Sequence, residues 1–264
     1  MNEIKIDSIE ELLRALNELP NHYIYRGHAD ADWLLESSLE RLIGRGWSAE
    51  SARKFEDFSL KQFKPKFHLY DRYNTVPMSK LAWLAIMQHH GVPTRLLDFS
   101  ESPYVALYFA LEAYQPQNQK DFAVIAIDYS SLMDQSLAEI QKRDGGFTET
   151  RSTLLDRQDN VFDEIVDRFS YDIAWVAEPD VLNARLDRQA GSFLLSGNRE
   201  RRIEEILTSQ IYANVSMLKY RIDHSLYAGS FALLRKMNMT SKSLYGDLDG
   251  LARAIRMQMQ VYSI

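Results

Sequence analysis

The sequence predicts an α+β fold, a single mixed sheet wrapped by helices, because helical and strand patterns alternate without the regular spacing of βαβ units. Phe122–Asp128 reads FAVIAID, a continuous apolar run typical of a central strand buried on both faces. With 264 residues the chain can bury one substantial core. We therefore expect one domain over residues 1–264, in which an N-terminal helical part, 1–90, packs on a sheet part, 91–264.

Capping signals place the elements in order. Ser8 and Glu11 form a capping box before a helix that ends at Pro20, and the aromatic run HYIYRG at 22–27 is a strand candidate. Further helices begin after Ser48, after Ser79 and after Ser102-Pro103. The later patterns predict strands at 122–128, 172–177, 191–195 and 215–222 and helices at 180–189, 199–207, 225–237 and 249–259.

Composition excludes several classes of protein. The chain has no Cys, so it has no disulfide, thiolate zinc site or Cys nucleophile, and its six His form no HExxH pair, so we expect no metal. There is no run of 18 apolar residues, mean hydropathy is −0.34, and the N-terminus has no apolar signal region. These features predict a soluble, cytoplasmic protein that makes no membrane contact.

Charge is distributed unevenly along the chain. The net charge is −6, yet residues 185–264 hold 12 Lys and Arg against 7 Asp and Glu, and residues 1–184 carry the acidic excess. A basic face on the C-terminal part would suit phosphate groups. Mixed charges that merely solvate helix faces are the alternative interpretation.

Gln88–Ser100, QHHGVPTRLLDFS, is the segment richest in chemically active side chains. It lies between two helix patterns and contains His89, Thr94, Arg95 and Asp98. A simple connector would hold fewer such groups. The structural alternative is that Arg95 and Asp98 form a buried ion pair that fixes the loop.

Two shorter segments also attract attention. Tyr25-Arg26-Gly27 ends the first aromatic strand pattern, where a guanidinium can hold a phosphate or carboxylate and a glycine lets a ligand approach the backbone. Gln189 lies at a helix-to-strand junction before Gly191. A structural salt bridge for Arg26 and an ordinary helix end at Gln189 are the alternatives. The sequence lacks the GxSxG elbow, the GxxxxGK[ST] loop and the GxGxxG turn.

The order of these motifs resembles the FRG domain family. The resemblance rests on YRG at 25–27, on W-x-L-x-x-S-L-x-R at 33–41, and above all on QHxGxPTRLLDFS-x-SPxxALYFA at 88–110. Weaker similarity continues in R-x-x-x-Q-x-G-x-F at 185–193 and in LYGDLDGLA at 244–252, where Gly246 departs from the usual aromatic and Pro. The resemblance therefore covers most of the chain.

FRG domains are distantly similar to ADP-ribosyltransferases, which implies a fold of that type with NAD as co-substrate and no metal. The implied catalytic residues are Arg26, Ser100 and Gln189, which follow the family order of Arg, Ser and Glu or Gln. The implied binding residues are Tyr25, Arg26, Gly27, His89, Thr94, Arg95 and Asp98. Gly191 stands where a second carboxylate is expected, so either Gln189 is the third member or the chain lacks the catalytic acid.

The resemblance further implies a macromolecular acceptor, protein or nucleic acid, and a role as a toxin or in phage defence with a neutralising protein partner. The alternative function is a non-catalytic module that binds nucleic acid or a protein. In that case Arg26, Arg41, Arg95 and the basic C-terminal segment would form a face that contacts phosphate. The absence of an aromatic–basic stripe for stacking bases weakens this alternative.

Overall fold

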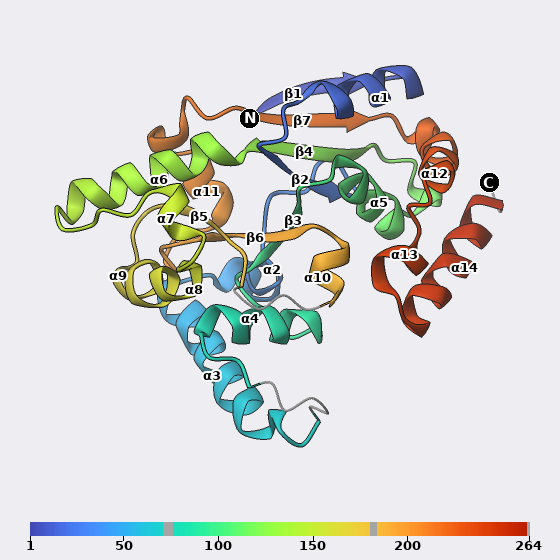
Figure 1. The fold of residues 1–264 in the computed structure, drawn as a ribbon. Coiled ribbons are helices and arrows are strands. Elements are labelled where there is room, and N and C mark those ends of the chain that lie inside the picture. Colours follow the sequence, from blue (N-terminus) through green and yellow to red (C-terminus); the bar gives the residue numbers. More distant parts are fainter. Residues whose placement is uncertain (71–75, 180–183, 263–264) are drawn as a thin grey trace.

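A computed structural model describes residues 1–70, 76–179 and 184–262 of the chain. Its centre is a seven-stranded mixed sheet in the order β1-β7-β4-β2-β3-β6-β5 (Figure 1). The pair β1–β7 is parallel and the other neighbours are antiparallel. The strands are β1 (Asn2–Ile6), β2 (Tyr23–His28), β3 (Leu97–Ser100), β4 (Phe122–Asp128), β5 (Ala174–Ala177), β6 (Gly191–Ser196) and β7 (Met217–Ile222).

Helices cover both faces of this sheet. The N-terminal half contributes α1 (Ile9–Glu18), α2 (Ser38–Ile43), α3 (Ala49–Phe67), α4 (Lys80–His89) and α5 (Pro103–Ala113). The middle contributes α6 (Tyr129–Arg143), α7 (Arg151–Leu154), α8 (Gln158–Val161), the π-helical turn η3 (Phe162–Val166) and α9 (Asp167–Phe169). The C-terminal part contributes α10 (Ala184–Arg188), α11 (Ile203–Leu207), α12 (Tyr227–Lys236), α13 (Ser241–Tyr245) and α14 (Leu248–Tyr262). Short 3₁₀ turns lie at Gly44–Gly46, Pro116–Asn118, Gln210–Tyr212 and His224–Leu226.

The central strand β4 explains why two cores form. All but the last of its residues are buried, and alternate side chains enter opposite cores, as a strand covered on both faces requires. Val124 belongs to the core that includes residues of α1, α5 and α12, while Ile125 belongs to the core that includes residues of α4, α6 and η3. The predicted strand at 122–128 and the α+β architecture are therefore confirmed.

Most of the predicted elements appear with boundaries shifted by a few residues. The capping hydroxyls of Ser8, Ser48, Ser79 and Ser102 each accept the backbone N–H three residues on. Gly91 adopts a φ of 81°, the left-handed region that favours glycine after a helix end. Of the helix predicted at 180–189, only Ala184–Arg188 forms α10, and residues 180–183 lie outside the described part.

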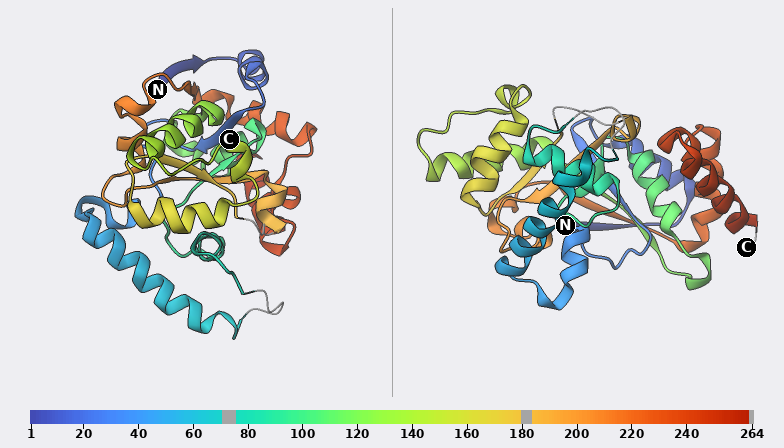
Figure 2. Two further views of the ribbon diagram at one scale, coloured as in Figure 1. Left: turned by 60° about the vertical axis from the view of Figure 1, so that its left-hand side comes forward. Right: turned by 90° about the horizontal axis from the view of Figure 1, so that it is seen from below.

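Several helices and strands were not predicted from the sequence: β1, β3, α2, α6, α7, α8, α9 and α13. The N-terminal part is not only helical, since it supplies the edge strand β1 and the inner strand β2. The last four residues of the Gln88–Ser100 segment form β3 rather than a loop, and α6 follows directly on β4. The amphipathic helix α3 extends away from the sheet, as the left view of Figure 2 shows. Its residues Phe55 and Phe58 are exposed.

Among the described residues, no helix combines the length and the apolar character that crossing a bilayer requires.

Candidate functional site

A pocket of about 700 Å³ opens where β2, β3 and the start of β6 lie side by side. The volume is in the range of pockets that bind cofactors and other small molecules. Arg26, Ser100 and Gln189, the three residues that the resemblance marks as catalytic, all line this pocket, although they lie far apart in the chain. The residues singled out from the sequence that line this pocket are Tyr25, Arg26, Gly27, His89, Asp98, Ser100 and Gln189.

Arg26 is held in the pocket by hydrogen bonds to neutral groups. Its Nη1 donates to the backbone carbonyl of Asp98 at 2.6 Å, and its Nε donates to Nε2 of His28 at 3.2 Å. Burial lowers the pKa of Arg26 to about 10; the nearby charge of Arg41 adds to this effect and Asp98 opposes it. Arg26 remains a cation at neutral pH, and in the described part of the chain no carboxylate pairs with it.

Ser100 and Gln189 are joined to each other through the backbone. The Ser100 hydroxyl donates to the Gln189 carbonyl at 2.7 Å and accepts from the N–H of Ser102 at 3.0 Å. The side-chain amide of Gln189 donates to the carbonyl of Leu244 at 3.4 Å. Between Gln189 and β6, Ala190 adopts a φ of 42°, an uncommon conformation for a residue with a Cβ. The position of Gln189 is thus fixed by its neighbours.

Two further polar residues line this pocket. The sequence analysis did not select His28, and it named Arg41 only as a phosphate contact of the alternative, non-catalytic module. His28 directly follows the YRG motif, is 3% exposed and lines the pocket. Its pKa is lowered to about 3 by burial, and the charges of Arg26, Lys219 and Arg41 add to the shift, so its imidazole is neutral. Arg41 from α2 also lines the pocket and donates to the backbone carbonyl of Glu36. Arg26 and Arg41 together make this end of the pocket cationic.

A buried carboxylate, Glu112 on α5, marks another end of the pocket. It accepts hydrogen bonds from Tyr108 at 2.8 Å and Tyr245 at 2.7 Å, and Nη1 of Arg253 lies 3.4 Å from Oε2. The sequence does carry a signal for it. Glu112 is the lone charged residue of the otherwise apolar helix Pro103–Ala113, and a charge on such a helix requires partners.

Thr94 and Arg95 have structural positions away from this pocket. Thr94 is buried, and its backbone bonds to Ser38 and Leu39 tie the segment to α2. Arg95 is 5% exposed and forms ion pairs with Glu56 and Asp167. The structural alternative, in which Arg95 pairs with Asp98, is therefore wrong. Asp98 on β3 instead accepts from the side-chain amide of Gln88 at 2.8 Å.

The ion pairs of Arg95 belong to a larger buried network between α3, α4 and α9. Glu56 also contacts Lys80 at 2.7 Å and Arg199 at 3.5 Å, and Asp167 contacts the same two cations at 3.0 and 3.3 Å. Burial acts to raise the pKa of Glu56, but the surrounding cations outweigh it and leave that pKa below its usual value. This network fixes the segment that leads into β3.

Gly27, which lines the pocket, also allows close packing. A Cβ at this position would stand 1.9 Å from the backbone oxygen of Ala106 and 2.6 Å from the backbone nitrogen of Ala110. The missing side chain thus lets β2 lie directly against α5.

His89 lies exposed at the end of α4, with its ring 4.8 Å from that of His90.

The basic excess of residues 185–264 is largely neutralised by the acidic N-terminal part. Arg202 pairs with Glu36 at 2.5 Å, and Arg221 lies 2.7 Å from both Glu3 and Asp32. Further pairs of this kind join Arg199 to Glu56, Lys219 to Glu3 and Arg253 to Glu112. Charges that are separated along the sequence therefore meet in the fold.

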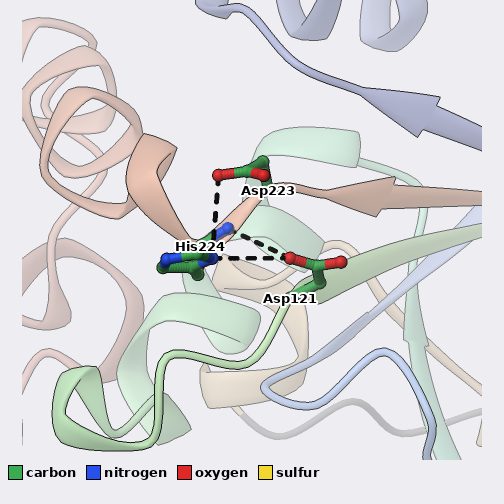
Figure 3. Close-up of side chains that lie close together, drawn as sticks. All are labelled: Asp121, Asp223 and His224. Carbon is green, nitrogen blue, oxygen red and sulfur yellow. Dashed lines mark hydrogen bonds and ion pairs between the residues drawn. The ribbon is translucent and has the colours of Figure 1, made fainter.

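Asp121, Asp223 and His224 form a group of metal-ligand type, shown in Figure 3. Their side chains are partly exposed, and Nδ1 of His224 lies 3.8 and 3.7 Å from the two carboxylates. The Asp223 carboxylate caps the turn that follows, because it accepts hydrogen bonds from the backbone N–H and the hydroxyl of Ser225. The guanidinium of Arg221 lies 3.8 Å from Asp121, so one of the two carboxylates already has a cationic neighbour.

The family model of the FRG domain matches residues 21–119. This stretch runs from the residues before β2 to the turn after α5, and it contains Arg26, Ser100 and Glu112. Gln189 and Arg253 lie beyond it. Comparisons with curated proteins and with solved structures give no match, and an ADP-ribosyltransferase is therefore not among the similar proteins found.

Proposed function

We propose that this protein is an ADP-ribosyltransferase that transfers ADP-ribose from NAD to a macromolecular acceptor. The observation that carries the proposal is the convergence of Arg26, Ser100 and Gln189 on one pocket of about 700 Å³. Three residues that a distant resemblance orders along the chain meet here, Arg26 on β2, Ser100 on β3 and Gln189 just before β6. Neither the family match nor the fold requires this meeting, so it supports the enzymatic interpretation.

The cationic end of the pocket suits the diphosphate of a dinucleotide. Arg26 and Arg41 are close enough for the charge of one to lower the pKa of the other. Two guanidiniums without carboxylate partners in the described part of the chain favour a bound anion, and guanidinium forks match phosphate oxygens. Trp33, 52% exposed on the pocket wall, offers a ring on which a base can stack.

In this proposal the chain mainly positions its substrates. Arg26 binds a phosphate, Ser100 holds the Gln189 loop in place, and Gln189 faces the ribose. The bond from ribose C1′ to the nicotinamide nitrogen breaks, and its electron pair leaves on the nicotinamide. An acceptor O–H or N–H then bonds to C1′ and releases a proton. Such chemistry gains from fixed geometry and from groups that stabilise positive charge.

The nucleic-acid module has less support from the same structure. Its contacts would come from Arg26, Arg41, Arg95 and the basic C-terminal segment. Arg95 is buried in an ion network, and several C-terminal arginines already pair with acidic residues. A role in phage defence and a neutralising protein partner belong to the proposal through the resemblance alone.

The test is NAD titration by calorimetry together with measurement of nicotinamide release. We expect the intact chain to bind NAD and release nicotinamide, and Arg26→Ala to lose about 10²–10³ in rate. Arg235→Ala, an exposed arginine on α12 outside the pocket, is the matched control and keeps wild-type values. An intact chain that neither binds NAD nor releases nicotinamide with protein and nucleic-acid acceptors overturns the proposal. Salt-sensitive binding of nucleic acid without NAD turnover would favour the module instead.

A further inference from the structure

The proposed reaction would be aided by a carboxylate in the pocket, and the neutral side chain of Gln189 does not supply one. Positive charge develops on the ribose, and the acceptor must give up a proton, so a carboxylate in the pocket would aid both events. Gly191 has no side chain to offer, and a Cβ there would meet Leu186 at 2.4 Å. The acid must therefore come from another element.

Among the residues that the structure describes, three carboxylates line the pocket, and two of them are poorly suited. Glu36 is paired with Arg202 at 2.5 Å. Asp98 is exposed and accepts from Gln88. Glu112 is 8% exposed and is held from two sides by tyrosine hydroxyls. Burial with fixed donors is the arrangement that keeps a catalytic carboxylate in one orientation.

The hydrogen bonds of Glu112 leave capacity for a ligand. A carboxylate has about four lone-pair positions on its two oxygens. Tyr108 uses one on Oε1, while Tyr245 and Arg253 approach Oε2. Oε1 therefore retains an acceptor position on a residue that lines the pocket. Tyr108, which bonds to Oε1, lies outside the pocket lining, whereas Tyr245 and Arg253, which approach Oε2, line the pocket together with Glu112.

Different charged groups act at the two ends of the pocket. The charges that act on Arg26 are those of Asp98 and Arg41, whereas the groups that act on Arg253 are Tyr245, Glu112 and Tyr108. Figure 1 shows α2, which carries Arg41, well away from α14, which carries Arg253. A ligand that spans the pocket would thus place its anionic part at Arg26 and Arg41 and another part at Glu112.

We propose that Glu112 is the catalytic carboxylate of this pocket, an assignment that rests on the proposed function. As the bond to nicotinamide breaks, the carboxylate stabilises the positive charge at ribose C1′. The acceptor O–H or N–H forms its bond to C1′, and its proton passes to Glu112 and then to solvent. α5 thereby replaces the acid that the residue two positions after Gln189 does not supply.

The experiment compares Glu112→Gln with Tyr108→Phe in the full chain. We expect Glu112→Gln to lower kcat for nicotinamide release by about 10²–10³, with little change in KM for NAD. Tyr108→Phe removes one of the hydrogen bonds that orient the carboxylate but keeps the carboxylate itself, so it should lower kcat far less than Glu112→Gln does while it lowers Tm. Glu112→Ala should regain activity on addition of formate, which supplies a carboxylate in the vacated space.

The outcomes separate the two proposals. If the wild-type chain releases nicotinamide and Glu112→Gln does so at a similar rate, the proposed function stands and the Glu112 assignment falls. If Tyr108→Phe and Glu112→Gln lose activity in parallel with Tm, and formate restores nothing, Glu112 is a structural link between α5 and α13 and the assignment is again overturned. A wild-type chain without NAD binding or turnover overturns both.

Discussion

The hydroxyl of Ser100 donates a 2.7 Å hydrogen bond to the backbone carbonyl of Gln189, which lies 89 residues further along the chain. The hydroxyl oxygen of Ser100 also accepts a hydrogen bond from the N–H of Ser102. Ser100 therefore links the end of β3, the start of α5 and the loop before β6. The adjacent bond from the N–H of Glu101 to the carbonyl of Ala190 at 2.9 Å strengthens this link. One side of the pocket is therefore fixed by Ser100.

Replacing Ser100 with Ala should destabilise the chain. The change leaves a buried carbonyl and an N–H without their partner, which costs about 1–3 kcal/mol. Urea denaturation of Ser100→Ala measures this loss. Ser225→Ala, which removes a hydroxyl from an exposed turn, is the control and should shift the midpoint less. Equal midpoints for the two variants would contradict a structural role for the Ser100 hydroxyl.

Adding a methyl group at Gly27 should force β2 away from α5. The new Cβ would overlap the backbone oxygen of Ala106, which cannot rotate away, so we expect a loss of about 1–3 kcal/mol or more. Gly145→Ala adds the same methyl group where nothing lies within 4 Å. Thermal unfolding of the two variants tests the expectation, which fails if Gly27→Ala melts at the wild-type temperature.

Breaking the buried ion network should cost far more than breaking a surface pair. Arg95→Met leaves Glu56 and Asp167 without their most buried cation, and loss of one partner in such a network costs about 3–5 kcal/mol. Arg157→Met removes the partner of Glu149 at an exposed position and should cost less than about 1 kcal/mol. Guanidinium denaturation compares them, and similar costs would argue against the network's importance.

Acid should destabilise the wild-type chain partly through His28. Its folded pKa of about 3 lies below the ordinary value of 6.5, so between these values the unfolded chain binds a proton that the folded chain does not. The contribution of His28 to the free energy of unfolding is fully present above pH 6.5 and is lost as the pH drops toward 3. We expect His28→Gln to lose less stability than wild type from about pH 7 to about pH 4.

Urea midpoints across that pH range provide the measurement. His90→Gln replaces an exposed imidazole at the end of α4 and should follow the wild-type curve. If His28→Gln keeps the full wild-type acid sensitivity, His28 is not the source of this part of the pH dependence.

Local patterns predicted the elements that carry their own signals. The apolar run of β4 and the capping serines of α1, α3, α4 and α5 depend on neighbouring residues alone, and they were placed correctly. β1 was missed because its alternation of Ile4 and Ile6 with polar residues covers only five residues, too few for a clear periodic signal. β3 was missed because Leu97–Ser100 is too short for a periodic signal.

The candidate site was predictable where its residues lie in recognisable motifs. Arg26, Ser100 and Gln189 were selected in this way, and the fold brings them to one pocket. Glu112 was not selected, because no motif marks a single carboxylate inside an apolar helix. Its importance depends on Tyr245 and Arg253, which approach it from α13 and α14.

The sequence alone determined the kinds of elements, the absence of thiols, and the three segments that hold the polar chemistry. Tertiary structure decided which charges meet. Arg95 pairs with Asp167, 72 residues away, rather than with Asp98, three residues away. The reason is that ion pairs in a low-dielectric interior form between groups that are buried together. Sequence spacing places Arg95 and Asp98 close along the chain, but β3 leaves the Asp98 side chain exposed while Arg95 enters the core.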